Sequence, residues 1–329
     1  MARRPVGLLF VIAALALLYF AFRSRQPGNA GIGPWAGGPA TPATVSTRPP
    51  ARETETVRIA TWNWEGWDER RLGDAAATAL LAQVVRQFDV IAVQGISPRS
   101  PNALPELCDR VNDDGSHYDY VIGPRVGRGE PKAQYAFLFD RSIIEVDRNQ
   151  TYTVRDDDDL LDREPLVAWF RARGPDPREA FTFSMVNAQI DPEDAAREIN
   201  LMDDVLRAVR NDGLDEDDVL LAGDLSVDDR HYGELGRVPR LLAVAAGLST
   251  TLDGTAQRDN LLLDEQSSVE FTGRGGTMDF LREFNLTVAQ ARSVAPRLPV
   301  WGEFSVYEGG GPGRFATRPV RPTGFAWPR

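Results

Sequence analysis

The chain has 329 residues, of which 42% are hydrophobic, and this composition is ample for a packed core. Its formal net charge of −11 opposes long-range attraction to nucleic acid, so a polyanionic partner would need a local basic patch or a bound cation. The single cysteine, Cys108, excludes a disulfide within the chain.

Residues 1–25 have the pattern of a membrane anchor. The segment from Pro5 to Phe22 is uncharged and apolar, and as a helix it would span about 27 Å, close to the thickness of a bilayer core. Arginines flank it on both sides and no small-residue cleavage site follows, which favours an uncleaved anchor over a cleavable signal peptide. We expect one N-terminal transmembrane helix, with the following domain on the extracytoplasmic side. Residues 26–56 are rich in Pro and Gly and predict a linker.

Residues 57–307 have the hydrophobic patterns of a folded domain, and 308–329 predict a flexible basic tail. Apolar residues at helical spacing predict helices at 68–88, 104–111 and 192–209, with helical segments around 235–246. Short apolar or alternating runs predict strands, at 57–63, 89–95, 118–122, 134–139, 143–146, 165–170, 181–187, 219–222, 260–263, 268–271 and 298–306. Strands interspersed with helices in both halves predict an α/β fold, in which two packed sheets form a sandwich flanked by helices.

One predicted strand ends in a charged residue. Val219 to Ala222 is apolar enough to be buried, Gly223 interrupts the run, and Asp224 follows at once. A carboxylate in such a place is costly unless it is paired, hydrogen-bonded or used. Asp224 is therefore either a cap for the following turn or part of a site, and its partners elsewhere in the chain decide between these roles.

Several blocks in order along the chain resemble the endonuclease/exonuclease/phosphatase superfamily, whose members share a DNase-like four-layer sandwich. The resemblance covers roughly 57–306. Each block is weak alone, but the ordered set favours this fold. The blocks are Arg58-Ile-Ala-Thr-Trp-Asn63, Asp89-Val-Ile-Ala-Val-Gln94, Gln134-Tyr-Ala-Phe-Leu-Phe-Asp140, Val186-Asn-Ala-Gln189, Leu221-Ala-Gly-Asp224, Asp259-Asn260 and Leu298-Pro-Val-Trp301.

The resemblance implies hydrolysis of a phosphodiester or phosphomonoester. In the family a carboxylate holds Mg²⁺ against the phosphate, a histidine with a carboxylate partner takes a proton from water, and amide and histidine donors stabilise the developing charge. Three positions keep the family's residue type: Asn63 as the amide beside the metal, Asp224 as the residue that orients water and donors, and Asp259 of a Tyr-Asp pair. Arg258 replaces the Tyr of that pair.

Six other family positions have lost the group that the chemistry needs. Gly95 stands in place of the metal-binding Glu. Pro296 and Arg297 stand in place of the Asp and the general-base His of a Ser-Asp-His block. The remaining replacements are Ala133 for a Glu, Gln189 for a second His and Ser226 for an Asn. The two histidines of the chain, His117 and His231, lie outside these motifs, and we expect both at the surface.

These losses predict a pseudo-enzyme that keeps the family fold without its hydrolysis. Mg²⁺ prefers oxygen ligands, so loss of the main carboxylate should severely weaken its binding, and we expect no cofactor. Arginine does not deprotonate in proteins and cannot serve as the base. The alternative is an active phosphohydrolase with a rearranged Mg²⁺ site made of Asn63, Asp224, Asp259 and Asp191.

Arg297 has two possible roles. It either neutralises a bound anion without a metal, together with a basic loop formed by Arg125, Arg128 and Lys132, or it pairs with Asp224 or Asp259 and fills the site. The acidic run 156–159 predicts a solvated loop rather than a calcium loop. The partners that we expect are the membrane and an anionic ligand or a protein, because the net charge argues against nucleic acid.

Overall fold

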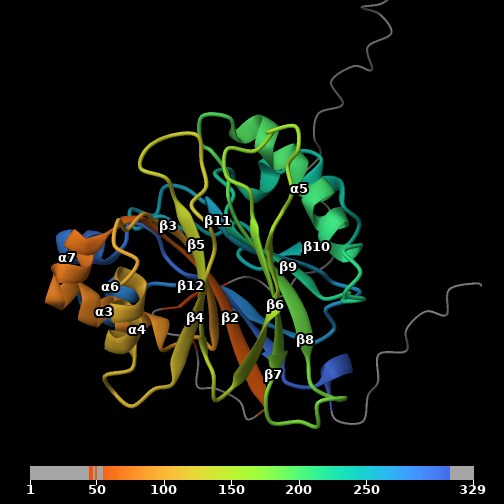
Figure 1. Ribbon diagram of the computed structural model, residues 1–329, viewed down its shortest axis with the longest axis horizontal. Coiled ribbons are helices and arrows are strands. Elements are labelled where there is room, and N and C mark those ends of the chain that lie inside the picture. The colour runs from red at the N-terminus through yellow and green to blue at the C-terminus, as the bar shows by residue number, and fades with distance from the viewer. Residues whose placement is uncertain (1–43, 47–48, 50–54, 312–329) are drawn as a thin grey trace, which may run out of the picture. The chain divides into compact units, whose positions relative to one another are not determined.

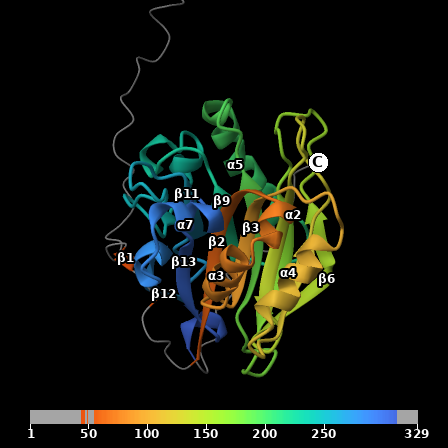
Figure 2. The ribbon, with the colours of Figure 1, turned by 90° about the vertical axis from the view of Figure 1, so that its left-hand side faces the viewer.

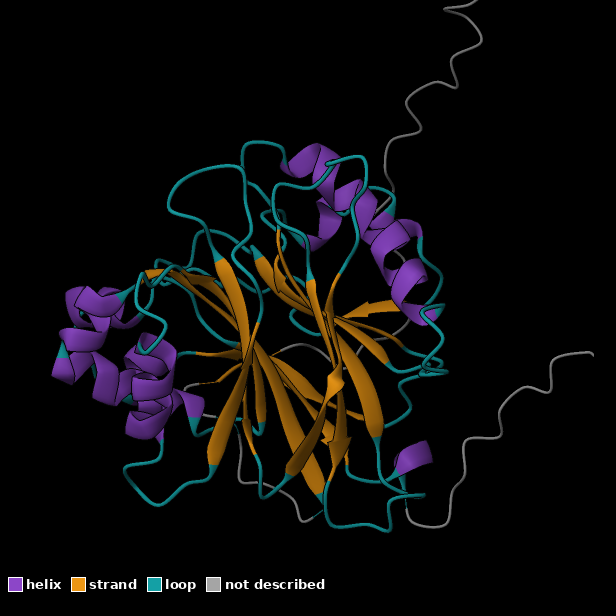
Figure 3. Cartoon of the chain, in the orientation of Figure 1, coloured by secondary structure: helices purple, strands orange, loops and turns teal. Residues whose placement is uncertain are grey.

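The computed structural model describes residues 44–46, 49 and 55–311, and these residues form two β-sheets packed face to face with helices on both outer sides (Figures 1 and 3). The predicted anchor and nearly all of the predicted linker and tail lie outside the described residues. None of the described helices is both long and apolar enough to cross a membrane.

The first sheet has seven strands in the order β1-β12-β13-β2-β3-β5-β4. Its strands are β1 (Thr44–Ser46), β2 (Thr56–Trp67), β3 (Val90–Ile96), β4 (Tyr118–Ile122), β5 (Gln134–Asp140), β12 (Phe271–Met278) and β13 (Val300–Ser305). The second sheet has six strands in the order β10-β11-β9-β8-β7-β6. Its strands are β6 (Ile144–Thr153), β7 (Leu166–Ala172), β8 (Thr182–Gln189), β9 (Val219–Asp224), β10 (Leu241–Ala243) and β11 (Asp259–Asp264).

Helices cover the outer face of each sheet. The helices are α2 (Glu69–Gly73), α3 (Ala75–Val85), α4 (Ala103–Val111), α5 (Ala195–Arg210), α6 (Phe280–Glu283) and α7 (Val288–Val294), with 3₁₀ turns η1 (Asp229–His231), η2 (Leu235–Arg237) and η3 (Glu308–Gly310). Figure 2 shows α3, α4 and α7 in front of the sheet that contains β2 and β3. The α5 helix lies on the other side and buries Ile199, Met202 and Leu206. The order helix, sheet, sheet, helix is the predicted four-layer sandwich.

The core between the sheets contains a run of aromatic rings. The ring centroids of Phe181 and Phe183 are 4.8 Å apart, and those of Phe170 and Phe183 are 5.3 Å apart. Phe181 also stacks on Phe304 of the other sheet, at 5.7 Å. Each such pair contributes about 0.5–1.5 kcal/mol beyond the area it buries. This rigid core holds the strand ends, and so the candidate site, in fixed positions.

Three of the predicted elements are wrong in detail. The strand predicted at 268–271 is a turn up to residue 270, and β12 begins only at Phe271. The helix predicted at 68–88 is two helices, because the chain breaks at Asp74, whose side chain then caps α3 by accepting from the Ala77 N–H at 3.0 Å. Asp68, the first residue of the predicted range, caps α2 by accepting from the N–H groups of Arg70 and Arg71. Of the helical region at 235–246 only one 3₁₀ turn forms, and Leu241–Ala243 instead pairs with β11 as an edge strand.

Candidate functional site

The strand register brings the three retained polar residues together at one end of the sandwich. Asp224 and Asp259 are direct partners in the antiparallel pair of β9 and β11. Asn63 of β2 reaches across from the other sheet, and its Nδ2 donates to Asp224 Oδ2 at 2.7 Å. All three side chains are buried. Asp224 is therefore a site residue rather than only a turn cap, although its Oδ1 also accepts from the Ser226 N–H at 2.9 Å.

Arg297 places its guanidinium among these carboxylates. Nη2 lies 3.3 Å from Asp224 Oδ2, Nη1 lies 4.0 Å from Asp259 Oδ2, and Nε lies 3.2 Å from Glu65 Oε2. The side chain is only 11% exposed. Its backbone is held by the Trp62 indole, whose Nε1 donates to the Arg297 carbonyl at 2.8 Å. Of the two roles considered for Arg297, the structure shows the internal ion pair.

Burial and neighbouring charge set the protonation of this group of residues. Burial lowers the pKa of Arg297, but Asp259, Asp224 and Glu65 outweigh that effect and raise its pKa above the ordinary value. Full burial, with Asp224 beside it, raises the pKa of Asp259 well above the ordinary value, while Arg297 and Thr250 oppose the rise. The Thr250 hydroxyl donates to Asp259 Oδ2 at 2.8 Å. One permanent cation thus compensates a buried acidic pair.

Gly95 lacks both a ligand atom and the space for one. Its φ of +70° is in the left-handed region, and a Cβ there would lie 2.2 Å from Asn63 Oδ1 and 2.5 Å from the Glu65 backbone N. A carboxylate at this position would require the strand ends to shift. With no oxygen ligand from residue 95 and a guanidinium against Asp224 and Asp259, the residues present do not fit a Mg²⁺ ion here.

The other replaced positions supply no proton acceptor of the lost kind. The backbone N–H of Gln189 donates to the Tyr135 hydroxyl at 3.0 Å, and its side-chain Oε1 is buried without a hydrogen bond. Ser226 Oγ donates to the Ile190 carbonyl at 3.0 Å. Ala133 forms a β-bridge with Val126, and the Pro296 carbonyl accepts from Leu252 N–H at 3.2 Å.

The remaining candidates lie apart from the ion pair. His117 and His231 are both exposed, as predicted. Arg258 contributes its backbone N–H to Thr250 Oγ1 at 2.9 Å. Asp191 Oδ1 accepts from the Glu193 N–H at 3.1 Å, and the Asp191 N–H donates to Glu198 Oε2 at 2.9 Å.

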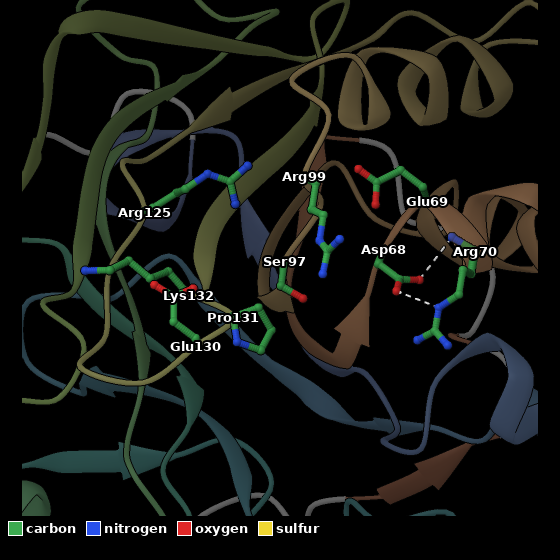
Figure 4. Close-up of a pocket in the computed structure, with 9 residues that line it drawn as sticks. All are labelled: Asp68, Glu69, Arg70, Ser97, Arg99, Arg125, Glu130, Pro131 and Lys132. Carbon is green, nitrogen blue, oxygen red and sulfur yellow. Dashed lines mark hydrogen bonds and ion pairs between the residues drawn. The ribbon is translucent and has the colours of Figure 1, made fainter.

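The predicted basic loop divides into two parts. Arg125 and Lys132 line a pocket of about 890 Å³ in which Arg70 and Arg99 add two further cations (Figure 4). Three acidic groups share the lining: Asp68 pairs with Arg70 at 2.9 Å, Glu69 Oε1 accepts from the Ser100 N–H at 2.5 Å, and Glu130 is exposed. The third member of the loop, Arg128, pairs instead with Asp159 at 3.2 Å and is not among the lining residues.

Sequence reasoning missed three site residues. Glu65 has no signal in strand alternation, because the register of β2 with β3 shifts between Asn63 and Trp67 and the φ of Glu65 is +42°. Thr250, the hydroxyl donor to Asp259, has no distinctive signal in a loop rich in Ser and Thr. Arg99 lies just after the strand that carries Gly95, in a Ser-Pro-Arg-Ser segment. Its position next to a strand end of the predicted site is the signal that could have identified it.

The four-layer sandwich, with an amide and two aspartates gathered at the strand ends, defines a DNase-like protein. The chain matches the endonuclease/exonuclease/phosphatase family over residues 60–327 and belongs to that family.

Curated relatives and solved structures agree with this assignment. Human deoxyribonuclease gamma is 26% identical over 262 residues, which cover 74% of this chain and 84% of that protein. Bovine deoxyribonuclease-1 is 27% identical over 263 residues, covering 74% and 91%. The human Nocturnin catalytic domain with bound sulfate has a TM-score of 0.53 at 13% identity, covering 79% of this chain and 100% of that chain. A functionally unknown protein from Enterococcus faecalis V583 has a TM-score of 0.54 at 12% identity, covering 74% and 98%. These two structures share the fold.

Proposed function

We propose that this protein is a family member without phosphoester hydrolysis, which acts as a membrane-anchored binding or scaffold module. The observation that carries the proposal is the position of Arg297, whose guanidinium contacts Asp224 and approaches Asp259 where the family's chemistry would need a divalent cation. The attached cation offsets the charge of Asp224, and the raised pKa of Asp259 favours its neutral form. Little negative charge is left with which to hold a metal and a phosphate together.

The proton chemistry is lost together with the metal chemistry. Gln189 has no titratable group, and Arg297 stays protonated. Loss of general acid–base catalysis alone costs about 10²–10⁴ in rate, and loss of a Lewis acid removes several kcal/mol of charge stabilisation in addition. A site lacking both supports only a small fraction of the family's rate.

The basic pocket supports the binding role. Arg99, Arg125 and Lys132 line it, and Arg99 and Lys132 form no ion pair with a described residue. A volume of about 890 Å³ is within the usual range for small-molecule sites. Cations that lack internal partners favour a ligand bearing phosphate or carboxylate groups, or an acidic segment of a protein. Nucleic acid is disfavoured by the net charge of −11.

The membrane part of the proposal rests on the sequence. The uncharged segment from Pro5 to Phe22 is long enough to span a bilayer as a single-pass anchor. Within the predicted linker 26–56, Thr44–Ser46 pairs with β12 as strand β1. The part over 26–43 would then tether the domain, on the extracytoplasmic side, near the bilayer surface.

The second candidate is an active metal-dependent phosphodiesterase, nuclease or phosphatase with a rearranged site. The convergence of Asn63, Asp224 and Asp259 favours it, because these three family groups still meet at one point. The deoxyribonuclease relatives favour it as well. Such an enzyme would require Arg297 to move away and Mg²⁺ to take its place.

A hydrolysis panel separates the two candidates. The full chain, purified in mild detergent, is assayed with Mg²⁺ or Mn²⁺ against DNA, an activated phosphodiester and an activated phosphomonoester. We expect no turnover above that of the Asp224→Ala variant, which serves as the background control. Turnover that disappears in Asp224→Ala would establish the second candidate instead.

A further inference from the structure

A second group of buried carboxylates lies at the opposite end of β9 from Asp224. Asp218 immediately precedes β9, Glu270 immediately precedes β12, and Glu308 begins η3. One oxygen from each of these three side chains lies within 4.8 Å of the others. The cluster is about 20 Å from the Arg297 ion pair, since six strand residues at about 3.3 Å each separate the two.

Among the described residues, no lysine or arginine compensates this cluster. Asp218 and Glu270 are each only 1% exposed, and within residues 55–311 neither they nor Glu308 form an ion pair with a lysine or arginine. Burial, with neighbouring acids, raises the pKa of Asp218 well above the ordinary value. Burial likewise raises the pKa of Glu270 and of Glu308 to about 7. Buried negative charge of this density requires either protons or a cation.

Hydrogen bonds fix the carboxylates while leaving oxygens free. Glu270 Oε1 accepts from the Gly309 N–H at 2.5 Å, and Glu308 Oε2 accepts from the Thr182 N–H at 3.2 Å. In contrast, Glu270 Oε2 and Asp218 Oδ1 are buried and have no hydrogen-bond partner within the described part of the chain. Ser268 is only 2% exposed, and its Oγ has no well-formed hydrogen bond among the described residues. It lies close enough to Asp218 to favour the charged carboxylate. Unpartnered buried oxygens from different segments thus face one another.

We propose that Asp218, Glu270 and Glu308 bind a calcium ion, with Ser268 as a further oxygen donor. Calcium accepts six to eight oxygen ligands at about 2.3–2.6 Å in flexible geometry, whereas magnesium demands a near-ideal octahedron. Three carboxylates whose oxygens all lie within 4.8 Å of one another, fixed by different segments of the chain, therefore suit calcium better. The ion joins β9 of one sheet to β12 of the other and to η3, where the described chain ends.

Thermal unfolding of the full chain in mild detergent tests the site. We expect CaCl₂ to raise the Tm of the wild type relative to EDTA, and MgCl₂ to raise it less. Asp218→Asn and Glu270→Gln should lose the calcium-dependent shift while remaining folded in EDTA, because each removes a buried uncompensated charge. Asp158→Asn, in the exposed acidic run 156–159, is the matched control and should keep the shift.

Terbium luminescence gives a second readout that does not depend on stability. The Trp169 indole donates to Glu216 Oε2 at 2.9 Å, and Glu216 lies beside Asp218, so this ring is close enough to sensitise a bound Tb³⁺ ion. We expect a tryptophan-excited signal that calcium displaces, that Trp169→Phe reduces and that Asp218→Asn abolishes. A wild type without a calcium shift, or an equal shift in Asp218→Asn, would overturn the proposal and leave shared protons as the way the cluster is neutralised.

Discussion

The two ends of β9 handle buried negative charge in opposite ways. At the end of the strand, Asp224 and its neighbour Asp259 are neutralised by Arg297, a cation from the chain itself. Just before the start of the strand, Asp218 lies beside two more carboxylates, and no described arginine or lysine forms an ion pair with any of the three. The comparison teaches that a retained aspartate is not evidence of a retained metal site, because the compensating charge decides what the carboxylate can bind.

The largest effect is expected at the compensated end. Arg297→Met keeps most of the side-chain volume but leaves the two aspartates without a cation, which should lower the free energy of unfolding by about 3–5 kcal/mol. Urea unfolding measures this loss. Arg292→Met, at an exposed position of α7, is the control and should change stability little. An Arg297→Met variant as stable as this control would show that the pair contributes nothing.

At the uncompensated end, stability should depend on pH. Burial, with Asp217 and Glu216 nearby, raises the pKa of Glu270 from 4.5 to about 7, so the folded state binds this proton more tightly than the unfolded state. The contribution is fully present below about pH 4.5 and is lost as the pH rises to about 7, which amounts to about 3 kcal/mol. Asp218 and Glu308 also face Glu270 and titrate with it.

The measurement is urea unfolding in EDTA across this pH range. Glu270→Gln should flatten the curve, because the amide does not titrate. Calcium should restore stability above pH 7 in the wild type only. A wild-type curve that is level between pH 4.5 and 7 would contradict the assigned burial of these acids.

Gly95 gives the next effect. Gly95→Ala combines the strain of a positive φ with a clash against Asn63 and Glu65, whereas Gly254→Ala, at φ +71°, has nothing within 4 Å of its Cβ. The difference between the two variants isolates the clash, and we expect about 2 kcal/mol from it. Equal losses in the two variants would mean that a side chain fits at residue 95, and Gly95→Glu would then become a fair attempt to restore a metal ligand.

The smallest effect concerns the basic pocket. Lys132→Gln should weaken the binding of inorganic phosphate several-fold, because an exposed charge contributes about 1 kcal/mol or less. Arg128→Gln is the matched control, since Arg128 pairs with Asp159 outside the pocket lining. Isothermal titration at low salt compares them. Equal weakening by both variants would point to the general field of the protein rather than to the pocket.

Much of the fold could be predicted from the sequence, because the spacing of apolar residues along a helix or strand reflects which of its faces is buried. The strands around Asn63 and Asp224 are examples. The break at Asp74 and the edge strand at Leu241–Ala243 could not be predicted, since a local cap and a tertiary pairing override the periodic pattern there.

The candidate site was predictable in its members but not in its pairing. Family blocks placed Asn63, Asp224, Asp259 and Arg297, yet only the register showed that one guanidinium reaches both aspartates. The cluster of Asp218, Glu270 and Glu308 could not be predicted, because its acids come from three distant segments of the chain. Of these, only the acidic run before Val219 leaves a local trace.

A double-mutant cycle between Arg297 and Asp224 tests the central claim most directly. The free energies of unfolding of the wild type, Arg297→Met, Asp224→Asn and the double variant give their coupling energy. If Arg297 stands in place of the metal, the coupling is about 2 kcal/mol or more and is the same in EDTA and in millimolar Mg²⁺. A coupling that is absent, or that vanishes when Mg²⁺ is added, would contradict the account, because it would mean that the ion can take these carboxylates from the arginine.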